Sequence, residues 1–238
     1  MIRTLFYKTQ NMLKENFETA SRPEQIENAK SALRKELKNW EKSKLENEIN
    51  RHNTGFYLGL TLQTQTIFSN LSKNNEKLNV NSKVQTDTSR DATKVCFLIE
   101  DHPGIFSRLA GAIALSGANV IDARTYTTSD GYATSVFWIQ SNEGKPFEEN
   151  RLSKLNKTIN EALKGQIIAR DILKEKGKIK RKEKDFIVPT NITFDNEGSE
   201  IHTIIEIETR DRLGLLYDLA RTCLLYTSDA ADEVSGGG

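Results

Sequence analysis

The chain has 238 residues, 34 of them Lys or Arg and 33 Asp or Glu, which leaves a formal net charge of +1. So small a charge gives no electrostatic reason to expect nucleic-acid binding, and no apolar run approaches the roughly 20 residues that a membrane span requires. The N-terminus lacks the layout of a signal peptide, and Cys96 lies in an apolar strand-like run, so the sequence predicts no disulfide framework and a cytoplasmic location.

Residues 1–76 are predicted to form a helical connector. Apolar side chains share one face of a first helix over residues 2–17, and a second helix begins at a capping-box pattern that starts at Ser21. This second helix runs to Trp40 with a narrow apolar stripe on a charged surface, which is typical of a helix that packs along one seam. A third, more apolar segment covers residues 55–71. Acids and bases alternate along the charged helix, so a solvated surface is favoured over a nucleic-acid surface.

Residues 77–198 are predicted to form an α+β domain of the ferredoxin-like type. The expected elements, in chain order, are a strand that begins at Leu78, a strand over residues 93–99, a helix over 105–116, strands over 119–128 and 132–140, a helix over 146–163 and a strand over 186–195. Counted from residue 93, the order is βαββαβ, which predicts four antiparallel strands with two helices on one face. The helical residues expected in the core are Ile105, Leu109, Ile113, Leu152, Leu155 and Ile159.

Glycines mark two of the expected boundaries. Gly117 follows the first helix of the domain, where a glycine commonly terminates a helix. Asp130-Gly131 is the strongest hairpin signal in the chain and joins the strands on either side of it.

One strand–turn–helix segment occurs twice, at residues 101–110 and 211–220, and each time it follows an apolar strand-like run. We call residues 101–105 the first entrance and residues 211–215 the second entrance. Each combines an aspartate, a turn and a glycine at the start of a helix, where backbone N–H groups lack helical partners and the helix dipole is positive. A small anion, such as the carboxylate of an amino acid, suits such a place. Residues 199–222 are accordingly predicted to be the truncated start of a second copy of the domain.

The segment from Cys223 onward interrupts the second copy in mid-helix and ends in glycines. It reads like the translation of a sequencing adapter, so we interpret residues 223–238 as non-native. A genuine helix end with a glycine-rich tail is the alternative.

Several motifs stand in the order of a known family. They are Asp101-His102-Pro103-Gly104, Gly117-Ala118-Asn119, Thr127-Thr128-Ser129-Asp130-Gly131, Phe186-Ile187-Val188-Pro189 and Gly214-Leu215-Leu216-Tyr217-Asp218-Leu219. The first two resemble the ACT domain, a small amino-acid-sensing module. The full set resembles the C-terminal regulatory region of the bacterial PII-protein uridylyltransferase/uridylyl-removing enzymes, closely from Thr93 to Thr222 and less closely before it. Leu213 departs from the proline that is common in that family.

The resemblance implies a role in nitrogen-status signalling. Members of the family transfer UMP to the PII protein and remove it again, and paired ACT domains that sense glutamine switch between the two reactions. For this chain it implies the sensing part, with glutamine or another small amino acid as ligand, the PII protein as a partner of the catalytic domains, and an ACT-mediated homodimer as one possible assembly. The alternative is a free-standing ACT regulator that acts through another protein.

The catalytic parts of the family are not found in the sequence. Gly198-Ser199 lacks the downstream pair of aspartates that the transferase needs, and His52, His102 and His202 are scattered, with none of them before an aspartate. We therefore predict no catalytic residue, no metal site and no cofactor in this chain, since the Mg and UTP of the family belong to its other domains. The chain is expected to catalyse neither reaction.

The resemblance also implies the residues of a ligand site. They are Asp101, His102, Gly104, Ile105, Phe106, Asn119 and Asp122 in the first copy and Asp211, Arg212, Gly214 and Leu215 in the second. Backbone N–H groups of the entrances would receive the carboxylate of an amino acid, and Asn119 and Asp122 would hold its ammonium group or orient the loop. Helix capping is the alternative role of the two entrance aspartates, and turn geometry is that of the two glycines. Because the second copy is truncated, we expect weak or no glutamine binding.

For two further features we prefer a structural explanation to a functional one. His102 has no accompanying cluster of acids, cysteines or histidines, which favours a solvent-facing loop residue over a catalytic base or a metal ligand. The basic stretch over residues 174–184 is interpreted as a solvated loop, because the predicted sheet lacks the aromatic signature of the ferredoxin-like domains that bind RNA.

Overall fold

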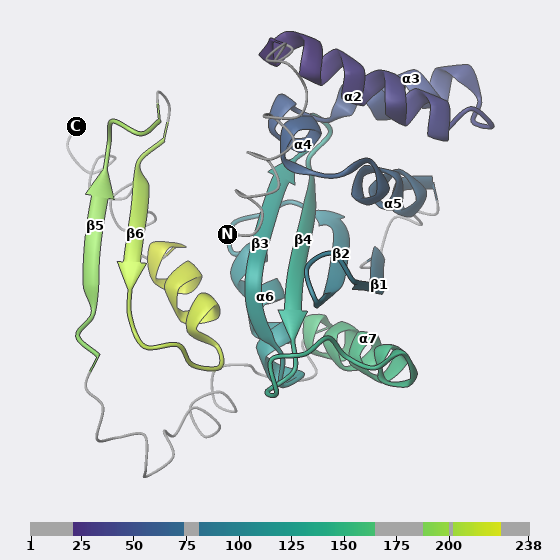
Figure 1. Ribbon diagram of the computed structural model, residues 1–238. Helices are drawn as coiled ribbons and strands as arrows, with labels where there is room; N and C mark the ends of the chain where they lie inside the picture. The colour runs from purple at the N-terminus through teal and green to yellow at the C-terminus, as the bar shows by residue number, and fades with distance from the viewer. Residues whose placement is uncertain (1–20, 74–80, 165–187, 200–201, 225–238) are drawn as a thin grey trace, which may run out of the picture.

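The computed structural model describes residues 21–73, 81–164, 188–199 and 202–224. The predicted helix over residues 2–17, the basic stretch and most of the C-terminal tail lie outside these ranges. The elements in chain order are α2 (Arg22–Glu36), α3 (Lys42–Arg51), α4 (Thr54–Gly59), α5 (Leu62–Lys73), β1 (Asn81–Asp87), β2 (Ala92–Glu100), α6 (Ile105–Leu115), β3 (Asn119–Thr127), β4 (Tyr132–Gln140), α7 (Glu149–Leu163), β5 (Asn191–Asp195) and β6 (Ile204–Glu208) (Figure 1). Residues 215–224 are also helical, and we call them the second-copy helix.

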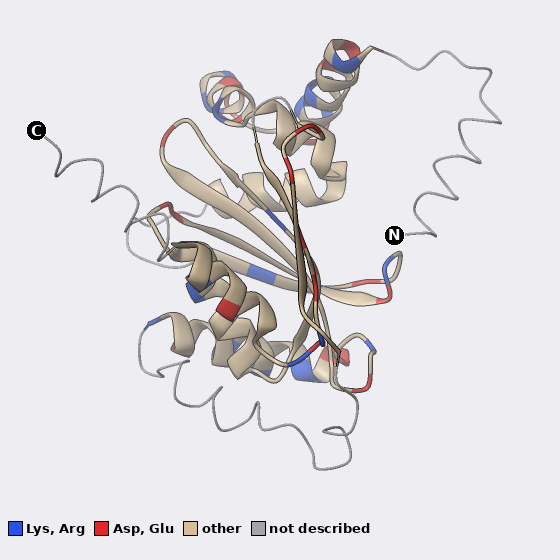
Figure 2. Cartoon of the chain, turned by 90° about the vertical axis from the view of Figure 1, so that its left-hand side faces the viewer, with Lys and Arg blue, Asp and Glu red and all other residues tan. Residues whose placement is uncertain are grey.

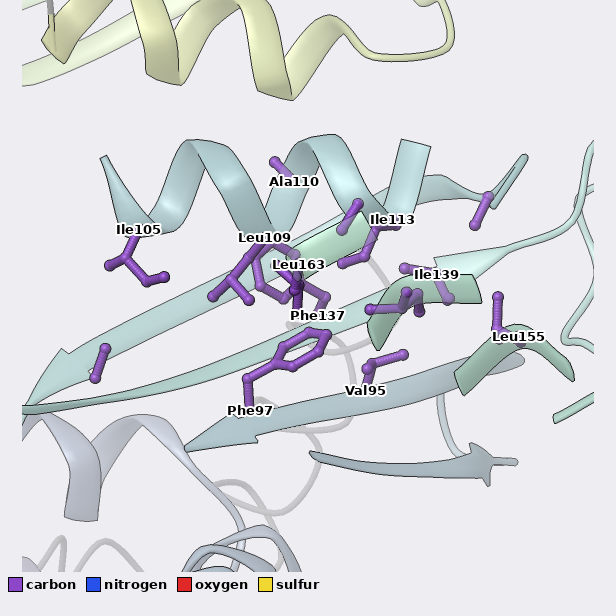
Figure 3. Packing of buried hydrophobic residues seen from close by; sticks show 14 of the residues in the cluster. Val95, Phe97, Ile105, Leu109, Ala110, Ile113, Phe137, Ile139, Leu155 and Leu163 are labelled. Carbon is purple, nitrogen blue, oxygen red and sulfur yellow. The ribbon is translucent and has the colours of Figure 1, made fainter. Parts of the chain in front are cut away.

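A four-stranded sheet in the order β1-β2-β4-β3 forms the centre of the first copy, and all of its neighbouring strands are antiparallel. Apolar side chains of α6 and α7 pack on one face of this sheet in a single core. In Figure 3, Leu109 of α6 points toward Phe97 and Phe137 of the strands. The helical residues predicted for this core are buried, except Leu152, which is half-buried against it. The α+β ferredoxin-like class, with two helices on one face, is confirmed.

The predicted turn glycines adopt backbone angles that other residues disfavour. Gly117 follows α6 with a φ of +79°, and Gly131 closes the β3–β4 hairpin with a φ of +81°. Both values lie in the left-handed region, where a residue without a Cβ atom avoids a steric cost. Both boundaries were therefore predicted correctly.

The outer position beside β2 is filled by a different strand from the predicted one. β1 pairs with β2 from Asn81 opposite Leu98 to Asp87 opposite Ala92. The strand predicted over residues 186–195 corresponds to β5, which pairs with β6 in a separate two-stranded sheet. The prediction that it completes the first sheet was wrong. A turn over residues 88–91 joins β1 directly to β2, and closing so short a loop costs less chain entropy than returning from beyond α7.

This pairing extends the internal repeat by one strand. The order β1, β2, α6 of the first copy recurs as β5, β6 and the second-copy helix. In Figure 1 the β5–β6 hairpin stands beside the larger sheet, with the second-copy helix between them. Each copy therefore begins with a hairpin whose second strand leads into an entrance.

The connector helices cover the face of the sheet opposite α6 and α7. A second apolar core joins Leu33, Ile49, Phe56 and Phe68 of the connector to sheet residues that include Trp138. The segment predicted over residues 55–71 is two helices, α4 and α5. The second predicted helix ends as α2 at Glu36, short of Trp40, and α3 has no counterpart among the individually predicted helices. Figure 2 shows acidic and basic residues interspersed along the helices at the top of the view, as the alternating charges predict. The sheet is therefore buried on both faces.

Candidate functional site

The two entrances have the same backbone geometry. Gly104 has a φ of +85° and Gly214 a φ of +80°, in the region that favours glycine. In each entrance the N–H of the residue after the glycine donates to the carbonyl three residues before it, at 3.1 Å. The N–H groups of Ile105 and Leu215 are thus already used inside the turns. Turn geometry alone accounts for both glycines.

Asp101 ties the first entrance to the β3–β4 hairpin. Its N–H donates to the carbonyl of Gly131 at 2.8 Å, and its carboxylate accepts a hydrogen bond from the hydroxyl of Thr127 at 2.6 Å. The N-cap residue of α6 is Gly104, and no described side chain caps this helix. The capping role considered for Asp101 was therefore wrong, because its carboxylate holds the loop to the end of β3 instead.

His102 is an exposed loop residue of the first entrance. Its Nδ1 lies 3.0 Å from the carbonyl oxygen of Pro103, and its Nε2 lies 3.3 Å from Nη1 of Arg108. Arg108 also donates to the carbonyl of Leu163, at the end of α7, at 2.8 Å. This arrangement fits the preferred interpretation of a solvent-facing loop histidine.

The side chains of the first two residues of α6 pack in the core. Ile105 is buried, and the ring of Phe106 stacks on that of Phe137 with the centroids 5.4 Å apart. Their side chains are thus packing groups, and the backbone N–H of Ile105 is already used inside the turn.

At the second entrance an ion pair takes the place of the histidine contact. Nη2 of Arg212 lies 2.6 Å from Oδ2 of Asp218. The residues at the same places in the first copy are His102 and Arg108. The contact from loop to helix therefore recurs, but the arginine lies in the helix of the first copy and in the loop of the second. Each entrance therefore has its loop fastened to the first turns of its own helix.

The second-copy helix packs antiparallel on the outer side of α6. Near its beginning, Leu213 packs with Ala114 and Leu115 at the end of α6. Near its end, Cδ2 of Leu224 would lie 2.9 Å from a Cβ atom placed on Gly104. Leu213, the residue that departs from the family pattern, thus makes an apolar contact with the first copy, and Leu224 covers the first entrance.

A cavity of about 150 Å³ lies between the second entrance and the start of β3. It is lined by Ala110, Ala114, Ala118, Asn119, Val120, Asp211, Arg212, Gly214, Leu215, Leu216, Tyr217 and Leu219. In Figure 3, Ala110 is the labelled residue of α6 that points away from the sheet. Sites for drug-sized ligands measure about 300–1,000 Å³, so this cavity suits one smaller molecule. Its walls are mostly apolar, and its few polar groups come from both copies.

The structure brings together only part of the predicted site. Asn119 and the predicted residues of the second entrance line the cavity. The first entrance lies at the other end of β3, where Asp101 meets Thr127. At roughly 3.3 Å per residue, the eight steps of β3 from Asn119 to Thr127 separate the two ends by about 25 Å. Asp122 does not line the cavity, because it faces the connector and its Oδ2 lies 2.5 Å from Nη1 of Arg90.

The sequence analysis missed the small residues that form one wall. Ala110 and Ala114 are one helical turn apart, so they lie on the same face of α6, and Ala118 follows the helix. A row of alanines on the side of a helix away from its core residues allows another helix to approach closely. That spacing was a usable signal in the sequence.

In the described parts of the chain, no His, Cys, Asp and Glu side chains gather in groups of three or more that could hold a metal ion. No helix within the described ranges is long and apolar enough to cross a membrane. Cys96 is buried in β2, and this burial raises the pKa of its thiol to about 12, which leaves it unreactive at neutral pH.

Comparison with known proteins relates the sequence of this chain to a family. No protein-family model matches the chain. The chain is 48% identical to the bifunctional uridylyltransferase/uridylyl-removing enzymes of Cereibacter sphaeroides, over 222 residues, and Ruegeria pomeroyi, over 225 residues. It is 33% identical to the enzyme of that name from Azospirillum brasilense. Each match covers 93% of this chain but only 24%, 25% and 24% of the respective relative. The chain therefore belongs to the family of bifunctional uridylyltransferase/uridylyl-removing enzymes, with which it shares a segment about a quarter of their length.

Proposed function

We propose that this chain is the amino-acid-sensing segment of a bifunctional uridylyltransferase/uridylyl-removing enzyme. In this proposal β1 to α7 form a first ACT domain, and β5, β6 and the second-copy helix begin a second one. The observation that carries the proposal is the cavity of about 150 Å³ that both copies line. A site built from two copies responds to their relative placement, which is what a sensor requires.

The groups around the cavity suit the two charges of an amino acid. At the start of the second-copy helix, the backbone N–H groups that follow Leu215 and the helix dipole favour a carboxylate. The carboxylate of Asp211 and the side-chain carbonyl of Asn119 can both accept hydrogen bonds from an ammonium group. The small alanines of α6 leave room for a short side chain. Glutamine or another small amino acid is the ligand that we propose.

The proposed ligand site is displaced from the predicted one. From the sequence, both entrances were expected to form the site together with Asn119 and Asp122, and weak or no binding was expected because the second copy is truncated. The cavity instead uses the second entrance together with the start of β3, and this chain contains both. We therefore propose that the chain binds one amino acid.

The consequence of binding belongs to the whole enzyme. We propose that ligand binding here reports nitrogen status to catalytic domains that transfer UMP to the PII protein and remove it, and that the PII protein contacts those domains. A free-standing regulator remains the alternative, but relatives about four times as long favour a segment of a larger enzyme.

A thermal-unfolding screen with the common L-amino acids tests the proposal. A ligand present at 100 times its Kd stabilises the folded state by about 2.7 kcal/mol, which raises the Tm of a chain of this size by about 5 °C or more. We expect such a rise with glutamine or a similar amino acid, its loss in Asn119→Ala, and its retention in Asn142→Ala, which removes the same amide from an exposed turn. No rise with any amino acid, or an equal rise in both variants, would count against the cavity as the site.

A further inference from the structure

β3 contains an irregularity beside the cavity. Its register with β4 pairs Val120 with Ile139 and Asp122 with Trp138, so Ile121 is an extra residue in the strand. The side chain of Ile121 is 48% exposed. Bulges of this kind change the direction in which the neighbouring side chains point, and they are common beside functional sites.

The bulge separates side chains that a regular strand would place on the same face. Residues two apart in a strand normally point to the same side. Here Val120 lines the cavity and packs with the core beneath α6, whereas Asp122 faces the connector with Arg90. Their partners in β4 divide in the same way, with Ile139 in the core under α6 and Trp138 in the core under the connector. One strand therefore contacts the cavity before the bulge and the connector after it.

Beyond the bulge, Arg124 fastens β3 to the end of α4. Its Nη1 donates to the carbonyl of Gly59, and its Nη2 lies 3.5 Å from Oδ2 of Asp122. The last carbonyls of a helix have no partner within the helix. The side-chain amide of Gln65 donates hydrogen bonds to the nearby carbonyls of Tyr57 and Leu60, at 3.2 and 2.9 Å. The carbonyl of Gly59 receives its hydrogen bond from Arg124 instead.

Tyr126 reinforces the same contact. Its ring lies over the two glycines of α4, with Cε1 at 3.1 Å from a Cβ atom placed on Gly55, and its hydroxyl fills the space where a Cβ atom of Gly59 would stand. The amide of Asn53, whose carbonyl oxygen caps α4 through the N–H of Phe56, also lies 3.5 Å from the carbonyl of Thr127. The short helix α4 is therefore attached to β3 along its length.

We propose that β3 couples the cavity to the connector, with the bulge at Ile121 as the joint and Arg124 as the contact that transmits the change. A ligand that displaces Asn119 or Val120 shifts the strand at the bulge. The shift moves Asp122 and Arg124 relative to Gly59 and changes how firmly the end of α4 is held. The identity of the ligand rests on the proposed function, whereas the coupling rests on the contacts of β3.

Hydrogen exchange of the backbone amides over residues 54–60 measures this coupling. With saturating L-glutamine we expect exchange in this segment of the unaltered 238-residue chain to change by about fivefold or more, the lower end of typical couplings between sites. The change in exchange should fall below about twofold in Arg124→Met. It should persist in the control variant Arg151→Met, because Arg151 belongs to α7 and its guanidinium lies over the ring of Phe147. Arg124→Lys keeps the charge without the fork that reaches two acceptors, and it should lose most of the change even if Arg124→Met fails to fold.

A second arm needs no ligand. Asn119→Ala alters the cavity end of β3. We expect this single substitution to change the hydrogen-exchange rates of residues 54–60. In a chain that already carries Arg124→Lys, adding Asn119→Ala should leave these rates unchanged. If glutamine binds but leaves residues 54–60 unchanged, or if the change survives in Arg124→Lys, the coupling is refuted. If no amino acid binds and Asn119→Ala still acts through Arg124, the coupling stands and the proposed function fails. If neither ligand nor Asn119→Ala affects the segment, the coupling is also refuted.

Discussion

Asn119 and Asp211 line the same cavity, although one begins a strand of the first copy and the other belongs to the entrance of the second. Their meeting follows from the antiparallel packing of the second-copy helix on α6, which places the start of one helix beside the end of the other. The first entrance meets the end of the second-copy helix by the same packing, as the contact between Gly104 and Leu224 shows. The two entrances are thus reciprocal, and the described chain completes the cavity at one of them.

Gly104 and Gly117 should cost about the same to replace. Both have positive φ, at +85° and +79°. A Cβ atom at Gly104 would come within 3 Å only of Cδ2 of Leu224, the end of a side chain that can rotate away, and nothing lies within 4 Å of one at Gly117. Gly104→Ala and Gly117→Ala should therefore each cost the backbone term of about 1–2 kcal/mol, as urea unfolding of both variants measures. A much larger loss in Gly104→Ala alone would show that the second-copy helix is held rigidly against the first entrance.

The stability of the fold should depend on the contact between the buried Lys94 side chain and Asp87. The Lys94 side chain is 2% exposed, and its Nζ lies 3.4 Å from Oδ2 of Asp87 and 3.1 Å from the hydroxyl of Thr64. Trp138 donates to the same carboxylate at 2.9 Å. Asp87→Asn should destabilise the fold by about 3 kcal/mol because it leaves a buried charge without its partner. Adding Lys94→Met should recover part of that loss, and a cost of Asp87→Asn within about 0.5 kcal/mol of zero would contradict the account.

Glu48 should make the connector sensitive to acid. Burial alone would raise the pKa of this carboxyl, but the hydrogen bond and charge of His52, the charge of Arg51 and the hydroxyl of Ser72 together lower the pKa below its ordinary value of 4.5. The folded pKa is then lower than the unfolded one, so the stabilisation is present above about pH 4.5 and is lost as the pH falls through the folded pKa.

Urea midpoints measured from about pH 7 down to pH 3 test this dependence. Glu48→Gln should lower the midpoint near neutral pH and flatten its fall in acid, whereas Glu143→Gln, in an exposed turn, should leave the profile unchanged. An acid profile of Glu48→Gln that parallels the unaltered chain would exclude Glu48 as the source of the acid sensitivity.

The 238-residue chain should neither transfer UMP from UTP to the PII protein nor remove it. Its histidines are scattered, and the described residues gather no metal-binding group. Labelled UMP incorporation and release are the measurements. Turnover that survives repurification and disappears in His102→Ala would show that the first entrance has been misread.

Local patterns predicted the turns, the helices of the first copy and the repeat, because each depends on residues close in sequence. Gly117 and Gly131 have the backbone angles that their positions imply. The partner of β2 was mispredicted because β1 and β5 have similar local patterns, and the choice between them depends on the connections. The segment that precedes a strand is as available for pairing as one that follows it.

The site was only partly predictable for a related reason. The resemblance identified Asn119 and the second entrance, but which entrance meets Asn119 depends on how the second-copy helix docks on the alanines of α6. The bulge at Ile121 could not be inferred from alternation, yet it turns Asp122 to the opposite face, since a shift of one residue reverses every side chain that follows.

Isothermal titration of the 238-residue chain with L-glutamine tests most directly the claim that the cavity between the copies is an amino-acid site. We predict binding with a stoichiometry of about one, because the cavity between the two copies has a volume suited to a single small molecule. Leu215→Trp enlarges a side chain that lines the cavity and should abolish the heat, whereas Leu58→Trp, on an exposed position of α4, should leave it unchanged. Equal heats in the unaltered chain and Leu215→Trp, or no heat in the unaltered chain, would contradict the account.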